Sequence, residues 1–125
     1  MAEKIPRHAW RQAKGQCFEA LALKFLEARG LELLARNVRC RLGEIDLVLL
    51  HHGTVVFTEV RYRRSTRYGS AHSTVDHQKQ RRIRDAARFF LSRHPLLARQ
   101  PCRFDVIGME GSDAGDITWI RGAFY

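Results

Sequence analysis

The amino-acid sequence predicts an α/β fold, in which a mixed central β-sheet is flanked by helices. Apolar residues follow a helical spacing in two segments, and five shorter runs are typical of strands. The predicted order is helix, three strands, helix, two strands. The runs between residues 43 and 61 are apolar on both faces, so both faces of the sheet need cover. The 125 residues are expected to form one domain, 1–125.

The first helix is predicted over residues 9–29. Apolar and small residues recur there at intervals of three and four, and Gly30 suits the position after a helix end. The positions that carry this pattern are Ala13, Cys17, Ala20, Leu21, Leu23 or Lys24, and Ala28. A strand is predicted next, over residues 31–41, because apolar and polar side chains alternate.

A β-hairpin is predicted over residues 43–61. If His52 and Gly53 form a two-residue turn, Leu50 pairs with Val55, and counting back places Asp46 opposite Glu59. Since side chains alternate between faces, four polar residues would then share one face, and five apolar residues would share the other. The polar set is Glu44, Asp46, Glu59 and Arg61, and the apolar set is Ile45, Leu47, Leu49, Val56 and Val60.

The opposed acids indicate a metal site. Carboxylates facing each other across a ladder have Cβ atoms about 5 Å apart and repel unless a cation lies between them. A hard divalent ion such as Mg²⁺ accepts two carboxylates and water as ligands. The alternative is that Asp46 and Glu59 are solvated surface acids, because a one-residue slip in register would place them on opposite faces.

The second helix is predicted to begin at Ser73–Asp76, with a hydroxyl cap, and to end near Arg93 before Pro95. Its inner face would carry Ile83, Ala86, Ala87 and Phe90. Because this helix separates the third and fourth strands, those strands can lie parallel. The last two strands are predicted over Cys102–Met109 and Asp116–Arg121.

The charge favours a polyanionic partner. The net charge is +9, the pI is about 10.3, and 18 of the 22 basic residues are arginine, which suits bidentate phosphate contacts. Eight arginines lie between Arg61 and Arg88, against two acids. This excess favours nucleic acid over a merely solvated surface or a membrane-surface helix.

The three cysteines indicate a reducing compartment. Cys17, Cys40 and Cys102 are scattered and form no Cys-x-x-Cys pair, so reduced thiols and a cytoplasmic location are expected, with Cys17 and Cys102 in the core. The sequence shows no signal peptide and no apolar stretch long enough for a membrane span. His51 and His52 are predicted to be turn residues and not zinc ligands, because adjacent side chains diverge and no second pair has ligand spacing.

Several short motifs, taken in order, resemble a known family. They are Gly15-x-x-x-Glu19 with the neighbouring alanine in the first helix, Asn37-x-Arg39, Gly43-Glu44-Ile45-Asp46-Leu47, Val56-Phe57-x-Glu59-Val60-Arg61-x-Arg63, Lys79-Gln80, Arg103-Phe104-Asp105-Val106 and Ala123-Phe124. Together they resemble the core of the PD-(D/E)xK nuclease superfamily. The closer resemblance is to the YraN-like family of bacterial proteins, predicted endonucleases similar to archaeal Holliday junction resolvases.

The resemblance implies a restriction-endonuclease-like core and hydrolysis of phosphodiester bonds in structured or branched DNA. The implied catalytic residues are Glu19, Asp46, Glu59 and Arg61. Asp46, Glu59 and the backbone carbonyl of Val60 would hold Mg²⁺ or Mn²⁺, and Glu19 would assist through water. The residues expected to contact phosphates are Arg63, Arg64, Arg67, Lys79, Arg81 and Arg82. Symmetric cleavage by a resolvase needs a two-fold dimer, so a homodimer is left open.

One position departs from the superfamily pattern. Its lysine, two residues after the second acid, is replaced by Arg61, which stays charged and is a poor base. Lys79 is the candidate replacement, although a phosphate contact is the favoured role for it. The substitution leaves a second reading open, a non-catalytic nucleic-acid-binding module with a nuclease fold. A protein-interaction adaptor is a third, and it predicts no salt-dependent binding of nucleic acid.

Overall fold

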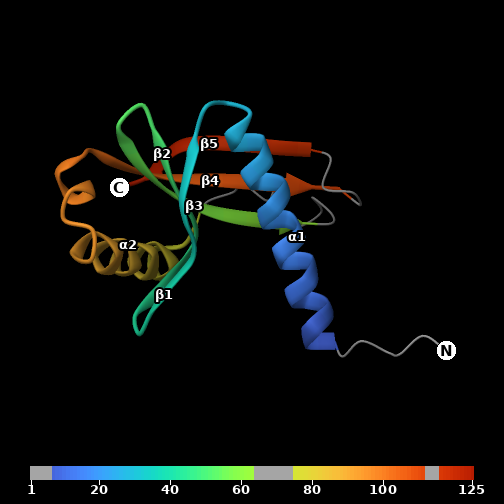
Figure 1. Ribbon diagram of the computed structural model, residues 1–125. Helices are drawn as coiled ribbons and strands as arrows, with labels where there is room; N and C mark the ends of the chain where they lie inside the picture. Colours follow the sequence, from blue (N-terminus) through green and yellow to red (C-terminus); the bar gives the residue numbers. More distant parts are fainter. Residues whose placement is uncertain (1–6, 64–74, 112–115) are drawn as a thin grey trace.

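The computed structural model describes residues 7–63, 75–111 and 116–125, with side chains from Cys17 onward. These residues form a mixed α/β structure with a five-stranded sheet, two α-helices and a short 3₁₀ helix (Figure 1). The elements are α1 (Arg7–Glu27), β1 (Glu32–Cys40), β2 (Gly43–His51), β3 (Thr54–Arg63), α2 (His77–Ser92), η1 (Leu97–Arg99), β4 (Cys102–Glu110) and β5 (Asp116–Phe124). The predicted order of helices and strands is confirmed.

The strands lie in the order β1-β2-β3-β4-β5. Neighbouring strands are antiparallel except β3 and β4, which are parallel and are connected through α2. The sequence predicts this parallel pair, because a helix between two strands can return the chain to the end of the sheet at which the first of the two strands began. Among the described residues, no helix is long and apolar enough to cross a membrane.

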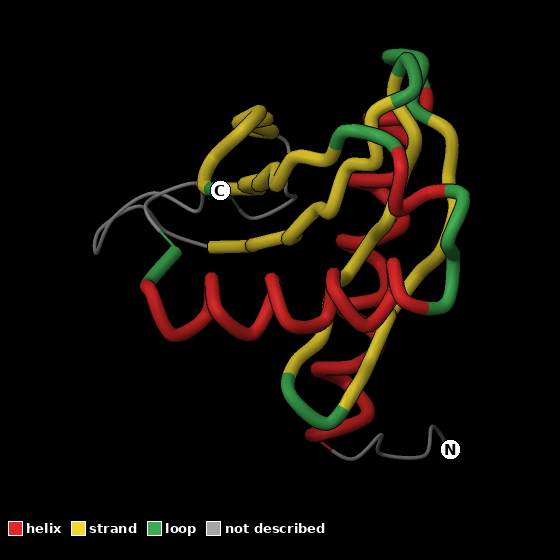
Figure 2. The backbone as a smooth tube through the Cα atoms, turned by 90° about the vertical axis from the view of Figure 1, so that its left-hand side faces the viewer, coloured by secondary structure: helices red, strands yellow, loops and turns green. Residues whose placement is uncertain are grey.

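The two helices cover different parts of the sheet. The apolar face of α2 (Ile83, Ala86, Ala87 and Phe90) is buried against strand residues that include Val48 and Phe57, as predicted. Helix α1 packs against Leu47, Leu49 and Val56 from the other side. Figure 2 shows α2 in front of the strands and α1 behind them.

The predicted apolar pattern of α1 is wrong in part: Leu23 packs against the core, but other predicted positions do not. Cys17 is exposed and Leu21 is 39% exposed, whereas Ala22 and Leu26 are fully buried. The partly buried Phe18 and Phe25 pack beside them, so the buried stripe uses the larger apolar side chains, which remove more surface from water. Cys102 is exposed as well, which contradicts its prediction as a core residue.

The hairpin of β2 and β3 has the predicted register. Leu50 pairs with Val55, and the turn residues His52 and Gly53 have φ values of 49° and 81°, as a tight two-residue turn requires. The prediction that both histidines are turn residues is wrong for His51, which is the last residue of β2 and is buried. Its Nδ1 lies 2.9 Å from Nη2 of Arg103.

The cap of α2 also differs from the prediction. Asp76, and not a hydroxyl side chain, is the N-cap, and its carboxylate accepts a hydrogen bond of 2.8 Å from the backbone N–H of Lys79. Ser73 lies outside the described residues. An aspartate cap satisfies a free N–H and complements the positive end of the helix dipole.

The turn between β1 and β2 is held directly against α2. A Cβ atom added at Gly43 would overlap the backbone carbonyl of Arg82. The atoms that would clash with the new methyl group belong to the backbone of α2 and cannot rotate away as a side chain could. Gly43→Ala is therefore expected to lower the free energy of unfolding by about 2 kcal/mol or more. Thermal or urea unfolding would measure this effect, and an unchanged midpoint would contradict the close approach.

Candidate metal centre

Asp46 and Glu59 come together where β2 and β3 separate. The ladder between these strands ends at the pair Leu47–Thr58, and the two acids lie one residue beyond it. The backbone N–H of Val60 is satisfied there by the Asp46 carboxylate, which accepts a hydrogen bond of 2.8 Å through Oδ2. The predicted proximity of the two acids is therefore present, with Asp46 reaching across toward β3.

The alternation of side chains breaks at Asp46. Ile45 is buried in the core beneath α2, whereas Leu47 is buried in the core beneath α1, so the prediction that they share a face is wrong. Asn37 occupies the β1 position between the partners of Ile45 and Leu47, and its φ is 50°. This irregular backbone accompanies the change of face and leaves Asp46 between the two helices.

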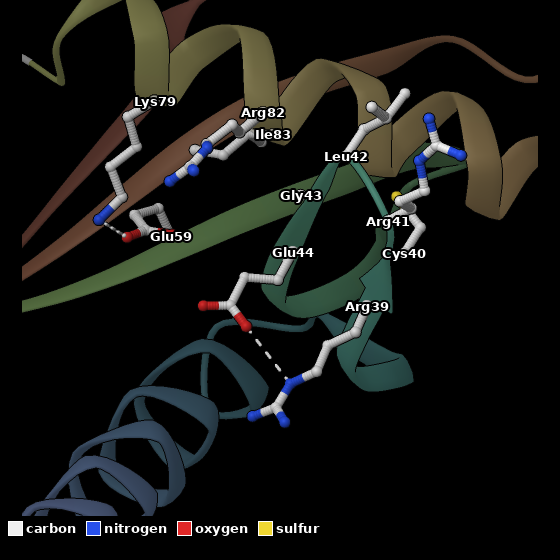
Figure 3. Close-up of a pocket in the computed structure, with 10 residues that line it drawn as sticks. All are labelled: Arg39, Cys40, Arg41, Leu42, Gly43, Glu44, Glu59, Lys79, Arg82 and Ile83. Carbon is white, nitrogen blue, oxygen red and sulfur yellow. Dashed lines mark ion pairs between the residues drawn. The ribbon is translucent and has the colours of Figure 1, made fainter.

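Lys79 belongs to the same group of charges. Its Nζ lies 2.7 Å from Oε1 of Glu59, which is 8% exposed, while the lysine side chain is 47% exposed (Figure 3). The lysine is in the first turn of α2, and the Asp76 cap fixes that turn. The position favoured by the sequence for a phosphate contact is thus in direct contact with an acid of the site.

Burial makes the two acids hard to ionise. Desolvation, opposed by the hydrogen bond from Val60, raises the pKa of Asp46 to about 6. Desolvation and then the neighbouring charge of Asp46 raise the pKa of Glu59 to about 7, although Lys79 lowers it. Two carboxyl groups that resist ionisation together form a strongly negative site once both are ionised.

These pKa values predict a pH-dependent stability in metal-free protein. Because the folded-state pKa values are raised, the folded chain binds protons more tightly than the unfolded chain. The two acids therefore stabilise the fold below about pH 4, and this contribution is lost as the pH rises through about 6 to 7. The melting temperature in EDTA is expected to fall by about 5 °C between pH 5 and pH 8.

The matched comparison for this pH effect is the double variant Asp46→Asn, Glu59→Gln, which keeps the shape of both side chains. Its melting temperature should depend less on pH than that of the wild type, because all other titrating groups are unchanged. Parallel curves for the two proteins would contradict the raised pKa values.

Glu19 approaches the pair from α1. Its negative charge contributes to the raised pKa of Asp46. The amide of Asn37, assigned with its nitrogen toward Glu19, donates to both carboxylate oxygens at 3.2 Å. The third predicted acid is therefore near the pair, oriented by a residue of β1.

The donor set of the site fits a hard divalent cation. Asp46 and Glu59 offer carboxylate oxygens, and their mutual repulsion is the energy that a bound cation would relieve. Within the described ranges, no three His, Cys, Asp or Glu side chains approach closely enough to complete a ligand set alone. A metal here would thus need backbone oxygen and water as further ligands, as Mg²⁺ commonly does.

The remaining predicted residues fall into four groups. Arg61 and Arg63 line a hollow of about 440 Å³ on β3, together with Glu59, Val60 and Lys79. Arg82 lines a separate pocket on the other side of Glu59, and Arg81 is exposed on α2 without lining either space. Arg64 and Arg67 lie outside the described residues.

The separate pocket has a volume of about 420 Å³ and lies between the β1–β2 turn and α2 (Figure 3). Glu59 and Lys79 stand at one side of it, and Figure 3 shows Arg82 pointing toward them. Glu44 and Arg39 line the opposite side and form an ion pair of 3.3 Å. The lining residues are Arg39, Cys40, Arg41, Leu42, Gly43, Glu44, Glu59, Lys79, Arg82 and Ile83.

The sequence interpretation missed roles for Asn37, Arg39 and Glu44. Asn37-x-Arg39 and Glu44 were visible as motifs, but their partners lie on α1 or across the hairpin. The signal that could have identified Arg39 is its hairpin position opposite Glu44. No comparable signal connects Asn37 with Glu19, because that contact depends on how α1 packs.

Comparison with known proteins places these residues in a family. The model of the uncharacterised protein family UPF0102 matches residues 18–109. A UPF0102 protein of Stutzerimonas stutzeri strain A1501 is 51% identical over 114 residues, covering 90% of this chain and 95% of the relative. A UPF0102 protein of Alcanivorax borkumensis is 50% identical over 113 residues, covering 89% and 90%. The chain therefore belongs to the family UPF0102, the YraN family that its motifs resemble.

Proposed function

We propose that this protein is a metal-dependent endonuclease that hydrolyses phosphodiester bonds in structured or branched DNA. The observation that carries the proposal is the close pair of the half-buried Asp46 and the buried Glu59, with Lys79 at 2.7 Å from Glu59 and two cation-lined spaces that Glu59 borders. The mixed sheet with helices on both faces is consistent with a restriction-endonuclease-like core.

Asp46, Glu59 and the carbonyl of Val60 would hold Mg²⁺ or Mn²⁺. A metal bound there would supply charge stabilisation at the scissile phosphate and lower the pKa of an attacking water. Both carboxyl groups must be ionised for this, and Lys79 favours ionisation because it lowers the pKa of Glu59.

The chain's own residues would complete the chemistry. Lys79, on α2, brings an ammonium group to Glu59. The superfamily supplies this kind of group from a lysine on the strand, two residues after the second acid. The three donors of Lys79 can orient a water or a phosphate oxygen. Arg61, on the same strand as Glu59, carries a permanent charge suited to the developing negative charge of the transition state.

The net charge of +9 supports a nucleic-acid substrate. Arg82 and Arg63 line the two spaces beside Glu59, and each would contact the DNA backbone as it extends away from the scissile phosphate. A cytoplasmic enzyme with reduced cysteines and, on branched substrates, a homodimer would complete this proposal.

The second candidate is a nucleic-acid-binding module that retains the nuclease fold without catalysis. Arg61 in the usual lysine position favours it, because arginine is a poor base. The two candidates differ in turnover and in metal dependence, while both predict salt-dependent binding.

The test is cleavage of labelled four-way junction, flap, duplex and single-stranded DNA in Mg²⁺, Mn²⁺ or EDTA. Metal-dependent products that disappear in EDTA are expected. Salt-dependent binding of all substrates without products in either metal would exclude the enzyme and leave the binding module. RNA versions of the same oligonucleotides would determine which nucleic acid is preferred.

A further inference from the structure

We propose that the pocket between the β1–β2 turn and α2 receives one unpaired nucleotide, and that Leu42 marks the boundary between paired and unpaired DNA. This inference rests on the proposed function for its class of substrate, and it adds what the protein would recognise beside the cleaved phosphate.

The pocket has the size and position for this role. Its volume of about 420 Å³ is within the range of small-ligand sites, and Glu59 and Lys79 form part of its wall. A nucleotide held there would be adjacent to the acid pair. A base inside a duplex cannot enter such a pocket without leaving the stack, so an unpaired base enters at lower cost.

The lining favours a base over a plain run of phosphates. Four cations (Arg39, Arg41, Lys79 and Arg82) provide donors, but Glu44 places a carboxylate among them. A carboxylate repels phosphate, whereas it accepts hydrogen bonds from the amino groups of bases. Cys40 and Leu42 add apolar surface on which a base can pack, and the core residue Ile83 lies at the wall behind them.

The turn that forms one wall is firmly positioned. Its backbone at Gly43 lies against the backbone of Arg82, so the pocket cannot widen there unless the β1–β2 turn moves away from α2. At the tip of this turn Leu42 is 59% exposed, although it is a large aliphatic residue beside Arg41. An exposed apolar side chain beside a cationic one is suited to pack against the last base pair while the cation holds a phosphate.

The experiment measures binding without metal, by fluorescence anisotropy in EDTA, with a forked duplex and a fully paired duplex of the same sequence. A 2-aminopurine at the first unpaired position reports separately whether that base leaves its stack. Wild-type protein is expected to bind the fork about tenfold more tightly and to change the 2-aminopurine signal.

The variants Leu42→Ser and Glu44→Gln are expected to reduce that preference to about twofold or less. Leu96→Ser and Glu32→Gln are matched controls: Leu96 is 76% exposed beyond the far end of α2, and Glu32 is exposed at the opposite end of β1. Both controls should retain the wild-type preference, since neither residue lines the pocket.

Equal binding of fork and duplex, or an equal preference in Leu42→Ser and wild type, would overturn the inference. Because no metal is present, the result is independent of cleavage. Fork preference without any metal-dependent cleavage would refute the nuclease proposal and support the pocket assignment. Metal-dependent cleavage without fork preference would support the nuclease proposal and refute the pocket assignment.

Discussion

Asp46→Asn is expected to lower metal-dependent cleavage by about 100-fold or more, while binding of DNA in EDTA is retained. Asparagine keeps an oxygen that can accept the hydrogen bond from Val60, but it removes the charge that would hold a divalent ion. A loss of this size is typical when a principal electrostatic contribution to a transition state is removed. Steady-state cleavage in Mg²⁺ and anisotropy in EDTA would measure the two effects.

The control is Asp85→Asn, an acid on α2 that pairs with Arg88 outside the site. It should retain wild-type cleavage. Asp46→Asn should also unfold at an equal or higher temperature at pH 8, because a partly desolvated charge has been removed. Undiminished cleavage by Asp46→Asn would refute the assigned metal centre.

Lys79→Met is expected to lower kcat by about 100-fold and to move the acid side of the pH–rate profile to higher pH. The ammonium group lowers the pKa of Glu59, so its removal leaves a smaller fraction of Glu59 ionised near neutral pH. Methionine preserves the length and apolar part of the side chain. Single-turnover cleavage between pH 6 and pH 9, with saturating DNA, would measure both changes.

Arg81→Met is the matched control for this prediction, because Arg81 is an exposed cation of the same helix that lines neither space beside Glu59. It should weaken binding and its salt dependence while kcat and the pH profile stay unchanged. If Lys79→Met behaved in the same way as Arg81→Met, Lys79 would be a phosphate contact only, as the sequence interpretation favoured.

Local patterns in the sequence were sufficient for much of the fold. The apolar runs between residues 43 and 61, the His52-Gly53 turn and the apolar spacing in α2 predicted the hairpin register, the element order and the parallel pair of β3 and β4. These features depend on contacts between near neighbours in the chain or on periods of two and 3.6 residues, which any single sequence displays.

The same patterns misplaced residues whose surroundings depend on packing. The buried face of α1 and the exposed Cys17 follow from how helix and sheet meet, and the pattern along one element does not reveal this. The change of face at Asp46 accompanies the irregular backbone at Asn37 on the neighbouring strand. His51 was interpreted from its neighbour, whereas the structure places it at the end of β2, buried and in contact with Arg103 of β4.

For the candidate site, local sequence was enough to predict that Asp46 and Glu59 lie close together, because the turn sets a register that runs to the pair Leu47–Thr58, one residue before the acids. The predicted ladder pairing of the two acids is absent, and the Asp46 carboxylate instead accepts a hydrogen bond from the backbone N–H of Val60. The other contacts of the site depend on how the helices pack. Lys79 reaches Glu59 because α2 packs its first turn beside β3, and Glu19 meets Asn37 because α1 crosses the other side. Lys79 and Glu59 are 20 positions apart in the sequence, and Asn37 and Glu19 are 18 apart. Such contacts form when separate elements bury their apolar faces together, and no local period in the sequence predicts which elements will pack.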